Sequence, residues 1–488
     1  MAACLAATVS LALSSATRAS AAPVMVLEPD GHAVVRDDPF VPAASLTSAP
    51  SVPTGARAAS AAGRRAARAR HGAPTPTVAG TLTKLWRAGA ISTSTYRGYR
   101  STLTAATSAL RRLRGLRAIE LSAVLANLHQ IAADGLLSAS RSPALFLTLE
   151  SNRRWWTQGP LLNPAQRVEL AGSELVWQYY PGQGIEIQEL GSFGKADGLF
   201  TGGPANYARM RHLLAELIAL VSMRGGGLAW EYFFRFEAGV PPWTSAMSQA
   251  TALEALSDAY RAFGDPGYLA LARRALPIFG QRPPVGVSVP TRRGLRYLLY
   301  SFAPGEAVIN GFLQSLIGLY DFWRTSGDAR AGRLFAAGDA EARAELPSYD
   351  TGAWSLYEPG QESDLNYHTL VTEFLHELCN RVRALAYCAT ALRFDAYLKT
   401  PPALRLLTLR VRASRSSGLR FIVSKVSHVG IIVTSARHTV LLTSAQFGRG
   451  IHAFGLPGLA PGSYAVRLAA TDLAGNFSRT TWTLQVSP

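Results

Sequence analysis

The stretch Asn310-Gly-Phe-Leu-Gln-Ser-Leu-Ile-Gly-Leu-Tyr-Asp321 is apolar and has the pattern of a buried helix. Two shorter motifs follow it, Pro347-Ser-Tyr-Asp-Thr-Gly-Ala-Trp-Ser355 and Asn366-Tyr-His368. Together the three segments place three tyrosines and a histidine in apolar, helix-like sequence beside glycine turns. This layout is typical of a sugar-binding cleft in which tyrosines transfer protons.

Helical sequence dominates the region around this stretch. The pattern between residues 205 and 398 predicts helices in successive pairs, at 205–224, 244–263, 266–278, 306–326, 328–345 and 368–396. Asp265-Pro266 has the form of an N-cap followed by proline at the first helical position. Farther upstream, residues 165–200 are strand-like, with a small β-hairpin expected around Pro181-Gly182. The pattern therefore predicts one mainly α, hairpin-rich domain over residues 79–400.

Different composition marks both ends of the chain. Residues 1–23 fit a secretory signal peptide, since an apolar run precedes small residues. Residues 24–78 are rich in Ala, Pro, Ser, Thr and Arg, which predicts a disordered linker. Residues 401–488 contain short alternating strands separated by turn clusters, which predicts an Ig- or fibronectin-like β-sandwich. We expect a secreted or cell-envelope location, and no transmembrane segment.

The two cysteines beyond the leader are Cys379 and Cys388. On one continuous helix nine residues would separate their Cα atoms by roughly 13 Å, which is too far for a disulfide. Pairing would need a turn between them, so the sequence favours two buried free thiols.

The chain has 488 residues and a formal net charge of +17, carried almost entirely by arginine. The length predicts two or three domains. The charge has two interpretations, an anionic partner or a codon-biased, solvated surface. Phosphate-binding, dinucleotide, HExxH and paired CxxC motifs are absent from the sequence. We therefore predict no cofactor and no catalytic metal, and no nucleic-acid partner.

Six ordered blocks between residues 228 and 398 resemble the C-terminal domain of the D-glucuronyl C5-epimerases. They begin with Pro241-Pro-Trp-Thr-Ser-Ala-Met-Ser-Gln249 and Gly264-Asp265 and continue through the motifs quoted above. The end of the chain is similar to bacterial surface Ig-like modules. The resemblance implies an α/α toroid that inverts C5 of uronic acid residues in an acidic polysaccharide without a cofactor. The predicted partner is therefore that polysaccharide, and the predicted assembly includes a homodimer.

The family reaction removes the proton α to the uronate carboxylate and returns one on the opposite face. It requires two proton-transfer groups and stabilisation of an enediolate. By resemblance, the catalytic residues are Tyr300, Tyr349 and Tyr367. The residues expected to bind the sugar are Trp243, Gln249, Asn310 and His368.

One departure from the family pattern concerns its paired glutamates. Counted back from Asn310, they fall on Leu298 and Leu299, and leucine cannot move a proton. Glu306 and Glu237 are the candidate substitutes.

Packing roles compete with each of these functional roles. Tyrosine in apolar helical sequence is more often a core residue, and we assign Tyr320 to that class. Trp243 is alternatively a plug at the toroid end, and His368 alternatively buttresses a neighbouring helix. For the whole protein, two rivals to the epimerase remain: a polysaccharide lyase acting by β-elimination, and a non-catalytic glycan-binding envelope protein.

Overall fold

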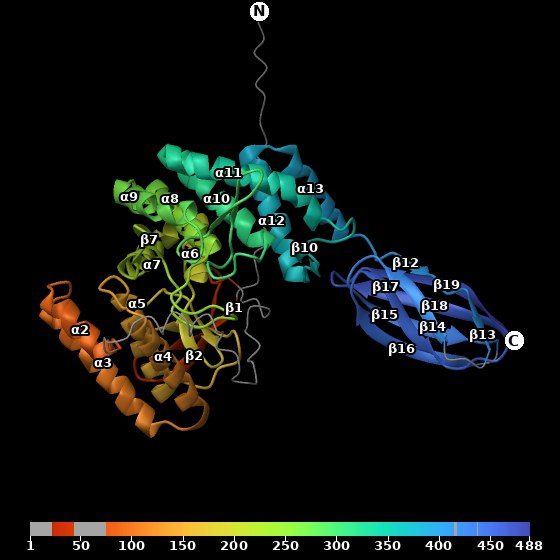
Figure 1. Ribbon diagram of the computed structural model, residues 1–488, viewed down its shortest axis with the longest axis horizontal. Helices are drawn as coiled ribbons and strands as arrows, with labels where there is room; N and C mark the ends of the chain where they lie inside the picture. The colour runs from red at the N-terminus through yellow and green to blue at the C-terminus, as the bar shows by residue number, and fades with distance from the viewer. Residues whose placement is uncertain (1–21, 43–74, 414–416, 437) are drawn as a thin grey trace, which may run out of the picture.

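The computed structural model describes residues 22–42, 75–413, 417–436 and 438–488. A large helical part is followed along the chain by a smaller part made of strands, which extends away from it (Figure 1). The strands of the smaller part begin at Leu404. The mainly α class with a strand-rich C-terminal region is therefore confirmed.

The helical part contains α2 (Val78–Arg87), α3 (Thr93–Arg112), α4 (Gly115–Ala133), α5 (Ser142–Gln158), α6 (Glu189–Thr201), α7 (Tyr207–Ala219), α8 (Ala246–Phe263), α9 (Pro266–Ala275), α10 (Ile309–Ser326), α11 (Ala329–Glu345), α12 (Leu365–Val382) and α13 (Leu385–Tyr397).

The last eight of these helices form four successive hairpins. The first helices of the pairs, α6, α8, α10 and α12, pack against one another in chain order. Helices α8 and α10 are buried on nearly all sides, as their apolar sequences require. Gly318 allows their close approach, because a Cβ there would lie 2.0 Å from the carbonyl oxygen of Ala250. The helix predicted from the opening stretch is thus the centre of this part.

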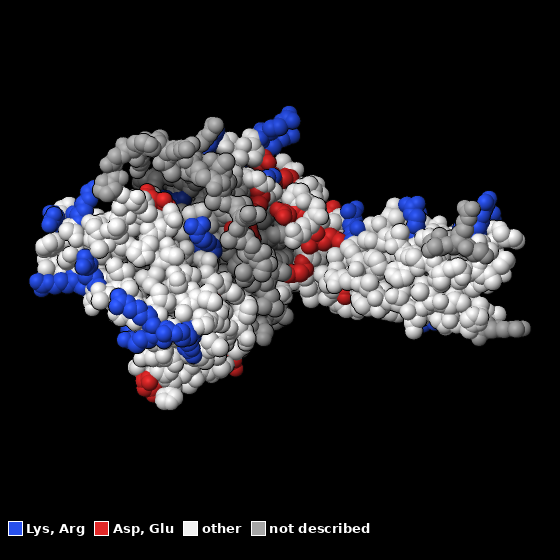
Figure 2. All heavy atoms as spheres, turned by 60° about the horizontal axis from the view of Figure 1, so that its bottom comes forward, with Lys and Arg blue, Asp and Glu red and all other residues white. Residues whose placement is uncertain are grey.

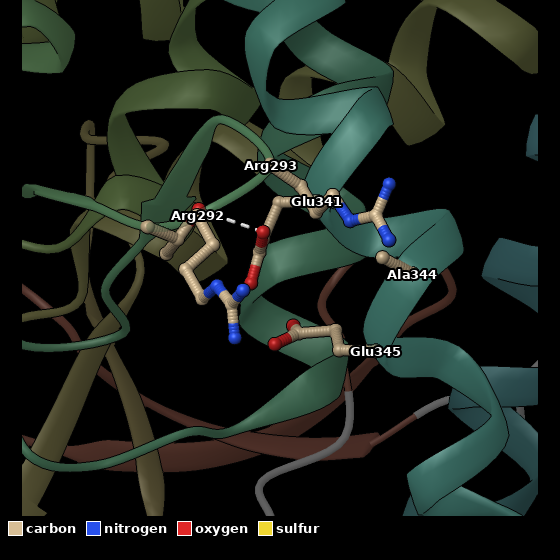
Figure 3. Close-up of a pocket in the computed structure, with 6 residues that line it drawn as sticks. Arg292, Arg293, Glu341, Ala344 and Glu345 are labelled. Carbon is tan, nitrogen blue, oxygen red and sulfur yellow. Dashed lines mark hydrogen bonds between the residues drawn. The ribbon is translucent and has the colours of Figure 1, made fainter.

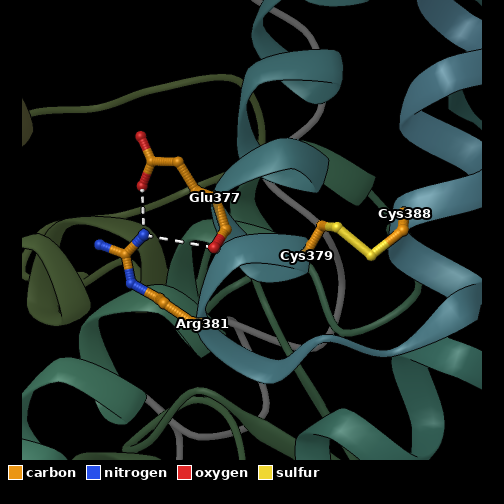
Figure 4. Close-up of a disulfide and its surroundings, with 4 residues drawn as sticks. All are labelled: Glu377, Cys379, Arg381 and Cys388. Atoms are coloured by element: carbon orange, nitrogen blue, oxygen red, sulfur yellow. Dashed lines mark hydrogen bonds and ion pairs between the residues drawn. A yellow bond between two sulfur atoms is a disulfide. The ribbon is translucent and has the colours of Figure 1, made fainter. Parts of the chain in front are cut away.

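The predicted helix 368–396 is in fact two helices. Helix α12 ends at Val382, Arg383 has a left-handed backbone with φ of 55°, and α13 begins at Leu385. This turn brings the Cα atoms of Cys379 and Cys388 to 4.8 Å, and the two residues form a disulfide (Figure 4). The expectation of two free thiols is wrong, since it assumed an unbroken helix.

Replacing both cysteines with alanine is expected to lower the free energy of unfolding by about 2–3 kcal/mol, the value for a short closed loop. The disulfide spans a sequence separation of only 9 residues, so the effect is at the lower end of the usual range. Urea unfolding of the wild type with and without reductant measures it. An identical midpoint in both conditions would contradict the prediction.

A five-stranded sheet lies beside the helices, in the order β2-β1-β3-β4-β5. Its strands are β1 (Ala22–Leu27), β2 (Ala33–Asp38), β3 (Arg167–Leu170), β4 (Trp177–Tyr180) and β5 (Gly184–Ile187). The linker prediction for residues 24–78 is therefore wrong over 24–42, because Val24 and Val26 are buried and β1 pairs in parallel with β3. Residues 1–21 of the predicted leader and 43–74 of the predicted linker lie outside the described residues.

A buried ion cluster ties β2 to the helical part. Lys195 on α6 lies 3.2 Å from Asp38, 2.6 Å from Glu169 and 2.7 Å from Glu174. Arg209 on α7 adds contacts of 2.7 Å to Asp38 and Glu174. The buried ammonium therefore has the anionic partners that a charge in a protein interior requires.

Three short hairpins connect the helices: β6 (Ser222–Arg224) with β7 (Gly227–Ala229), β8 (Ser288–Pro290) with β9 (Leu295–Tyr297), and β10 (Leu356–Glu358) with β11 (Gln361–Glu362).

The C-terminal part has two sheets around one hydrophobic core, as in a β-sandwich. The strand orders are β12-β14-β17 and β13-β19-β18-β15-β16. Alternate residues of β15 and β18 are buried, which is the period expected of a strand with one face in the core. The strands are β12 (Leu404–Leu406), β13 (Arg410–Arg412), β14 (Ser417–Val423), β15 (Ser427–Thr434), β16 (Thr439–Phe447), β17 (Gly450–Leu456), β18 (Gly462–Asp472) and β19 (Phe477–Ser487).

Specific contacts join the two parts. Lys425 is buried, pairs with Asp472 at 2.5 Å and donates a hydrogen bond to the Tyr397 carbonyl at 2.7 Å. The backbone N–H of Arg449, in the turn between β16 and β17, donates to Glu362 on β11 at 2.7 Å. Among the described helices, none is both long and apolar enough to cross a membrane.

Candidate functional site

An acidic cavity of about 260 Å³ lies where the β10–β11 hairpin meets the N-terminal ends of α10 and α12. The loop before α10 contributes Tyr300 and Glu306, and helix α12 contributes Tyr367. The remaining lining residues are Glu237, Val308, Tyr357, Glu358, Gln361, Glu362 and Asp364. The cavity is just under the range of about 300–1,000 Å³ usual for small-molecule sites.

Carboxyl groups dominate the charge of this cavity. Five of the described lining residues are Asp or Glu, and none is Lys, Arg or His. Burial, with repulsion from Glu237 and Glu358, raises the pKa of Glu306 to about 7. Burial and Glu358 also raise the pKa of Glu237. Near neutral pH, Glu306 therefore exists in both protonation states, which is the condition for general acid–base catalysis.

Glu237 also has an unusual backbone. Its φ is 50°, in the left-handed region that non-glycine residues seldom occupy. The flanking backbone holds it there, because Phe236 and Gly239 exchange hydrogen bonds of 3.3 and 2.7 Å. Such conformations concentrate at functional sites, so this observation supports a role for the carboxyl that the loop presents to the cavity.

Three tyrosines share the cavity with these acids. The rings of Tyr357 and Tyr367 lie 4.6 Å apart, and Tyr300 stacks on Phe302 at 5.2 Å. Burial, reinforced by neighbouring tyrosines and glutamates, raises the pKa of Tyr300 and of Tyr357 well above the ordinary value. These two phenols are thus protonated at neutral pH. They can donate a proton or a hydrogen bond, whereas a carboxylate is the better base here.

The structure brings two of the three predicted catalytic tyrosines together. Tyr300 and Tyr367 both line the cavity. Tyr349 does not, since it is 1% exposed and its hydroxyl donates to the carbonyl oxygen of Ala307 at 2.6 Å. That bond gives Tyr349 a packing role at the base of the loop that carries Glu306.

Two of the predicted sugar-binding residues lie in the core instead of the cavity. Trp243 is buried, stacks on Tyr232 at 4.2 Å, and donates from Nε1 to the Phe234 carbonyl. The amide of Gln249 is engaged by both backbone groups of Trp230, at 2.7 and 3.3 Å. Neither side chain is free to stack on, or hydrogen-bond to, a sugar.

Asn310 and His368 are buried as well. Asn310 accepts a hydrogen bond from the N–H of Gly311 at 2.8 Å. His368 stacks on Trp354 with ring centroids 3.7 Å apart, and its Nε2 donates to the Phe394 carbonyl at 3.1 Å. Burial lowers the pKa of His368 to about 4, so the ring is neutral. The alternative interpretation, that His368 buttresses a neighbouring helix, fits this geometry.

The sequence prediction missed Tyr357, Glu358 and Gln361. They form the hairpin β10–β11 between the two motifs that carry Tyr349 and Tyr367. The signal was present in Tyr357-Glu-Pro-Gly360, a turn that must lie close to both motifs because it connects them. Tyr320, assigned to the core, donates its hydroxyl to the Arg381 carbonyl at 2.7 Å.

A second hollow, of about 660 Å³, lies between the β8–β9 hairpin and α11 (Figure 3). It is formed by Thr291, Arg292, Arg293, Glu341, Ala344 and Glu345. Thr291 donates to Glu341 at 2.6 Å, and Glu345 pairs with Arg296. Because its carboxylates are already paired within the protein, this hollow is the weaker candidate.

Acidic side chains gather on one face of the molecule. Figure 2 shows them on the helical part next to the sandwich, with some Lys and Arg side chains beside them and others spread over both parts. Among the described residues, no group of three or more His, Cys, Asp and Glu side chains is arranged to hold a metal ion.

The residues that line the acidic cavity all lie in the part of the chain that matches a known protein family. Residues 225–396 match the family model described as the C-terminus of D-glucuronyl C5-epimerase. The D-glucuronyl C5-epimerase of Caenorhabditis elegans is 34% identical over 131 residues, which are 24% of this chain and 21% of that protein. An uncharacterized protein of Methanocaldococcus jannaschii is 31% identical over 167 residues, which are 31% of this chain and 50% of that protein. The match thus spans half or less of each relative.

Among solved structures, the cellobiose 2-epimerase of Spirochaeta thermophila is similar, with a TM-score of 0.34 and 15% identity. The likeness covers 58% of this chain and 73% of that chain.

Proposed function

We propose that this chain is a carbohydrate epimerase and that its reaction takes place in the acidic cavity. The proposal is supported by the match of residues 225–396 to the family model of the D-glucuronyl C5-epimerase C-terminus. The proposed substrate is a uronic acid unit of an acidic polysaccharide, inverted at C5. The proposal includes closure of the helical hairpins into an α/α toroid, and it retains the predicted secreted or envelope location.

One observation carries the proposal: a carboxyl with a pKa of about 7 faces the same cavity as tyrosines whose hydroxyls stay protonated. In the proposed reaction, the Glu306 carboxylate accepts the C5 proton, and the electrons of the C–H bond pass into an enediolate. A tyrosine hydroxyl, from Tyr300 or Tyr367, then delivers a proton to the opposite face of C5. Each turnover moves one proton out and one in, so electrons balance without a redox partner.

Stabilisation of the enediolate comes from hydrogen-bond donors. The phenol of Tyr357 lies in the same cavity, and because burial raises its pKa it stays protonated and can donate a hydrogen bond to the intermediate. Donors of this kind, fixed in a buried site, stabilise developing charge far more than they would in water.

Incubation with uronate polymers in D₂O tests the proposal. We expect deuterium at C5 of the polymer without the ultraviolet absorbance of an unsaturated product. The turnover number should rise as pH increases through about 7, because Glu306 must lose its proton to act as the base. An unsaturated product would identify a lyase instead. Binding without exchange on any uronan would identify a non-catalytic glycan-binding protein.

A further inference from the structure

Arg167, at the start of β3, is a buried cation with no hydrogen-bonding or ion-pair partner in the described part of the chain. It is 8% exposed, and its Nε and Nη1 atoms are buried with no hydrogen-bond acceptor. Among the described residues, none forms a hydrogen bond or ion pair with its guanidinium. The other buried cations differ: Lys195 contacts three carboxylates and Lys425 contacts Asp472. Buried charges are normally paired, so within residues 22–42, 75–413, 417–436 and 438–488 Arg167 lacks the anion that its burial calls for.

The guanidinium points at the N-terminus of α6. A Cβ on Gly191, in the first turn of that helix, would lie 3.3 Å from Arg167 Nη1. The N-cap residue Gln188 provides no side-chain cap, and Leu190 N–H donates to the Tyr232 hydroxyl at 3.2 Å. The positive end of the helix dipole and the arginine therefore converge on one place, and both favour an anion.

Burial disfavours the ionised form of the acids in this part of the chain. It raises the pKa of Glu189 to about 8, so Glu189 is mainly protonated at neutral pH, and it raises the pKa of Glu186 well above its ordinary value. Burial also shifts the pKa of Arg167 downward, which is the direction expected when an anionic partner is missing, although arginine keeps its charge in proteins.

Aromatic rings connect this place with the acidic cavity. Tyr180 lies 6.2 Å from Phe236, ring to ring, and Phe236 lies 5.4 Å from Tyr300, which lines the cavity. The acidic cavity itself has no cation among its described lining residues. Among the described buried cations, Arg167 is the one without an anionic partner, and its guanidinium is close enough to Tyr180, the first ring of this row, to act on that phenol electrostatically.

We propose that Arg167 and the N-terminus of α6 form an oxyanion site, which takes a carboxylate of the acidic glycan. The existence of the site follows from Arg167 and α6, and only the assignment to a glycan rests on the proposed function. A free inorganic oxyanion such as sulfate has the same recognition chemistry, so the test must separate the two sources.

Calorimetric titrations of the full chain with a glucuronate-containing oligosaccharide, a matched neutral oligosaccharide and sodium sulfate make that separation. We expect the wild type to bind the acidic oligosaccharide, and Arg167→Met to weaken that binding by about tenfold or more. Gly191→Ala should weaken it as well, because the added methyl group crowds the guanidinium. Exposed Arg333→Met is the control and should leave the affinity unchanged.

The melting temperature separates binding from a structural role. Because an unpaired buried charge is unfavourable, Arg167→Met should keep or raise the melting temperature while binding is lost. A lower melting temperature with unchanged binding would overturn the proposal, and so would sulfate binding without glycan binding. In one outcome, the wild type binds the glycan without catalysing C5 exchange. If Arg167→Met then loses glycan binding, the result would support this site and contradict only the proposed function.

Discussion

Replacing Glu306 with glutamine is expected to lower the rate of C5 deuterium exchange by about 10²- to 10⁴-fold, the usual contribution of a general acid–base group. Glutamine keeps the shape and the polarity of the side chain, but it cannot accept the C5 proton. The binding of the acidic oligosaccharide should persist, since a negative charge is removed from the cavity. Exchange rates and binding constants measured on the same preparations would show this split.

Glu358→Gln is the matched control, because it makes the same chemical change in the same cavity. Glu358 raises the pKa of Glu306 by repulsion, so its removal should lower that pKa. The variant should therefore remain active, with its pH–rate profile moved to lower pH. Equal loss of activity in both variants would show that the cavity needs its total charge and not a proton acceptor at Glu306.

Local sequence signals predicted the helical hairpins well. Helices α8 to α11 begin and end within a few residues of the predictions, because apolar periodicity and N-caps such as Asp265 and Asp328 are encoded locally. The break between α12 and α13 was missed, since it occurs at Arg383, a residue type that rarely adopts a left-handed backbone. The disulfide depends on that break and was missed with it.

Pairing between distant segments could not be predicted in the same way. Strand β1 pairs with β3, which comes more than a hundred residues later in the chain. The short apolar run of β1 contains no local sign of this partner, so the sequence around it predicted a linker. The same difficulty applies to the site, because contacts between distant residues decide which side chains face it. The motifs correctly identified segments that lie close together. Tyr349, however, points into the core, where its hydroxyl donates to the Ala307 carbonyl, while Tyr367 lines the cavity. Glu306 and Glu237 were identified as substitutes for the leucines, and both line that cavity.

Replacing Arg381 with methionine is expected to lower the free energy of unfolding by about 3–5 kcal/mol at pH 7, the cost of breaking a buried ion pair. Arg381 on α12 binds both carboxylate oxygens of Asp321, at 2.9 and 2.7 Å, and contacts Glu377 at 3.0 Å (Figure 4) and Glu254 at 3.4 Å. These acids come from α8, α10 and α12. Methionine would leave them facing one another without a cation.

The pH dependence of this loss identifies its cause. Burial, with repulsion among the acids, raises the pKa of Glu254 to about 8 and that of Asp258 to about 7. An acid with a raised folded-state pKa binds more protons in the folded than in the unfolded state, so stability falls as pH rises from about 4 to 8. Removing Arg381 raises these pKa values further, and the fall should become steeper. The deficit of the variant should therefore shrink between pH 7 and pH 5.

Urea unfolding of wild type, Arg381→Met and Arg333→Met at both pH values measures the effect. Arg333 is exposed on α11, so its replacement should change stability by less than about 0.5 kcal/mol. A deficit for Arg381→Met that stays constant with pH would mean that lost packing of the arginine stem, and not carboxylate repulsion, causes it. The prediction assigns Arg381 the role of joining α8, α10 and α12 through its contacts with Glu254, Asp321 and Glu377.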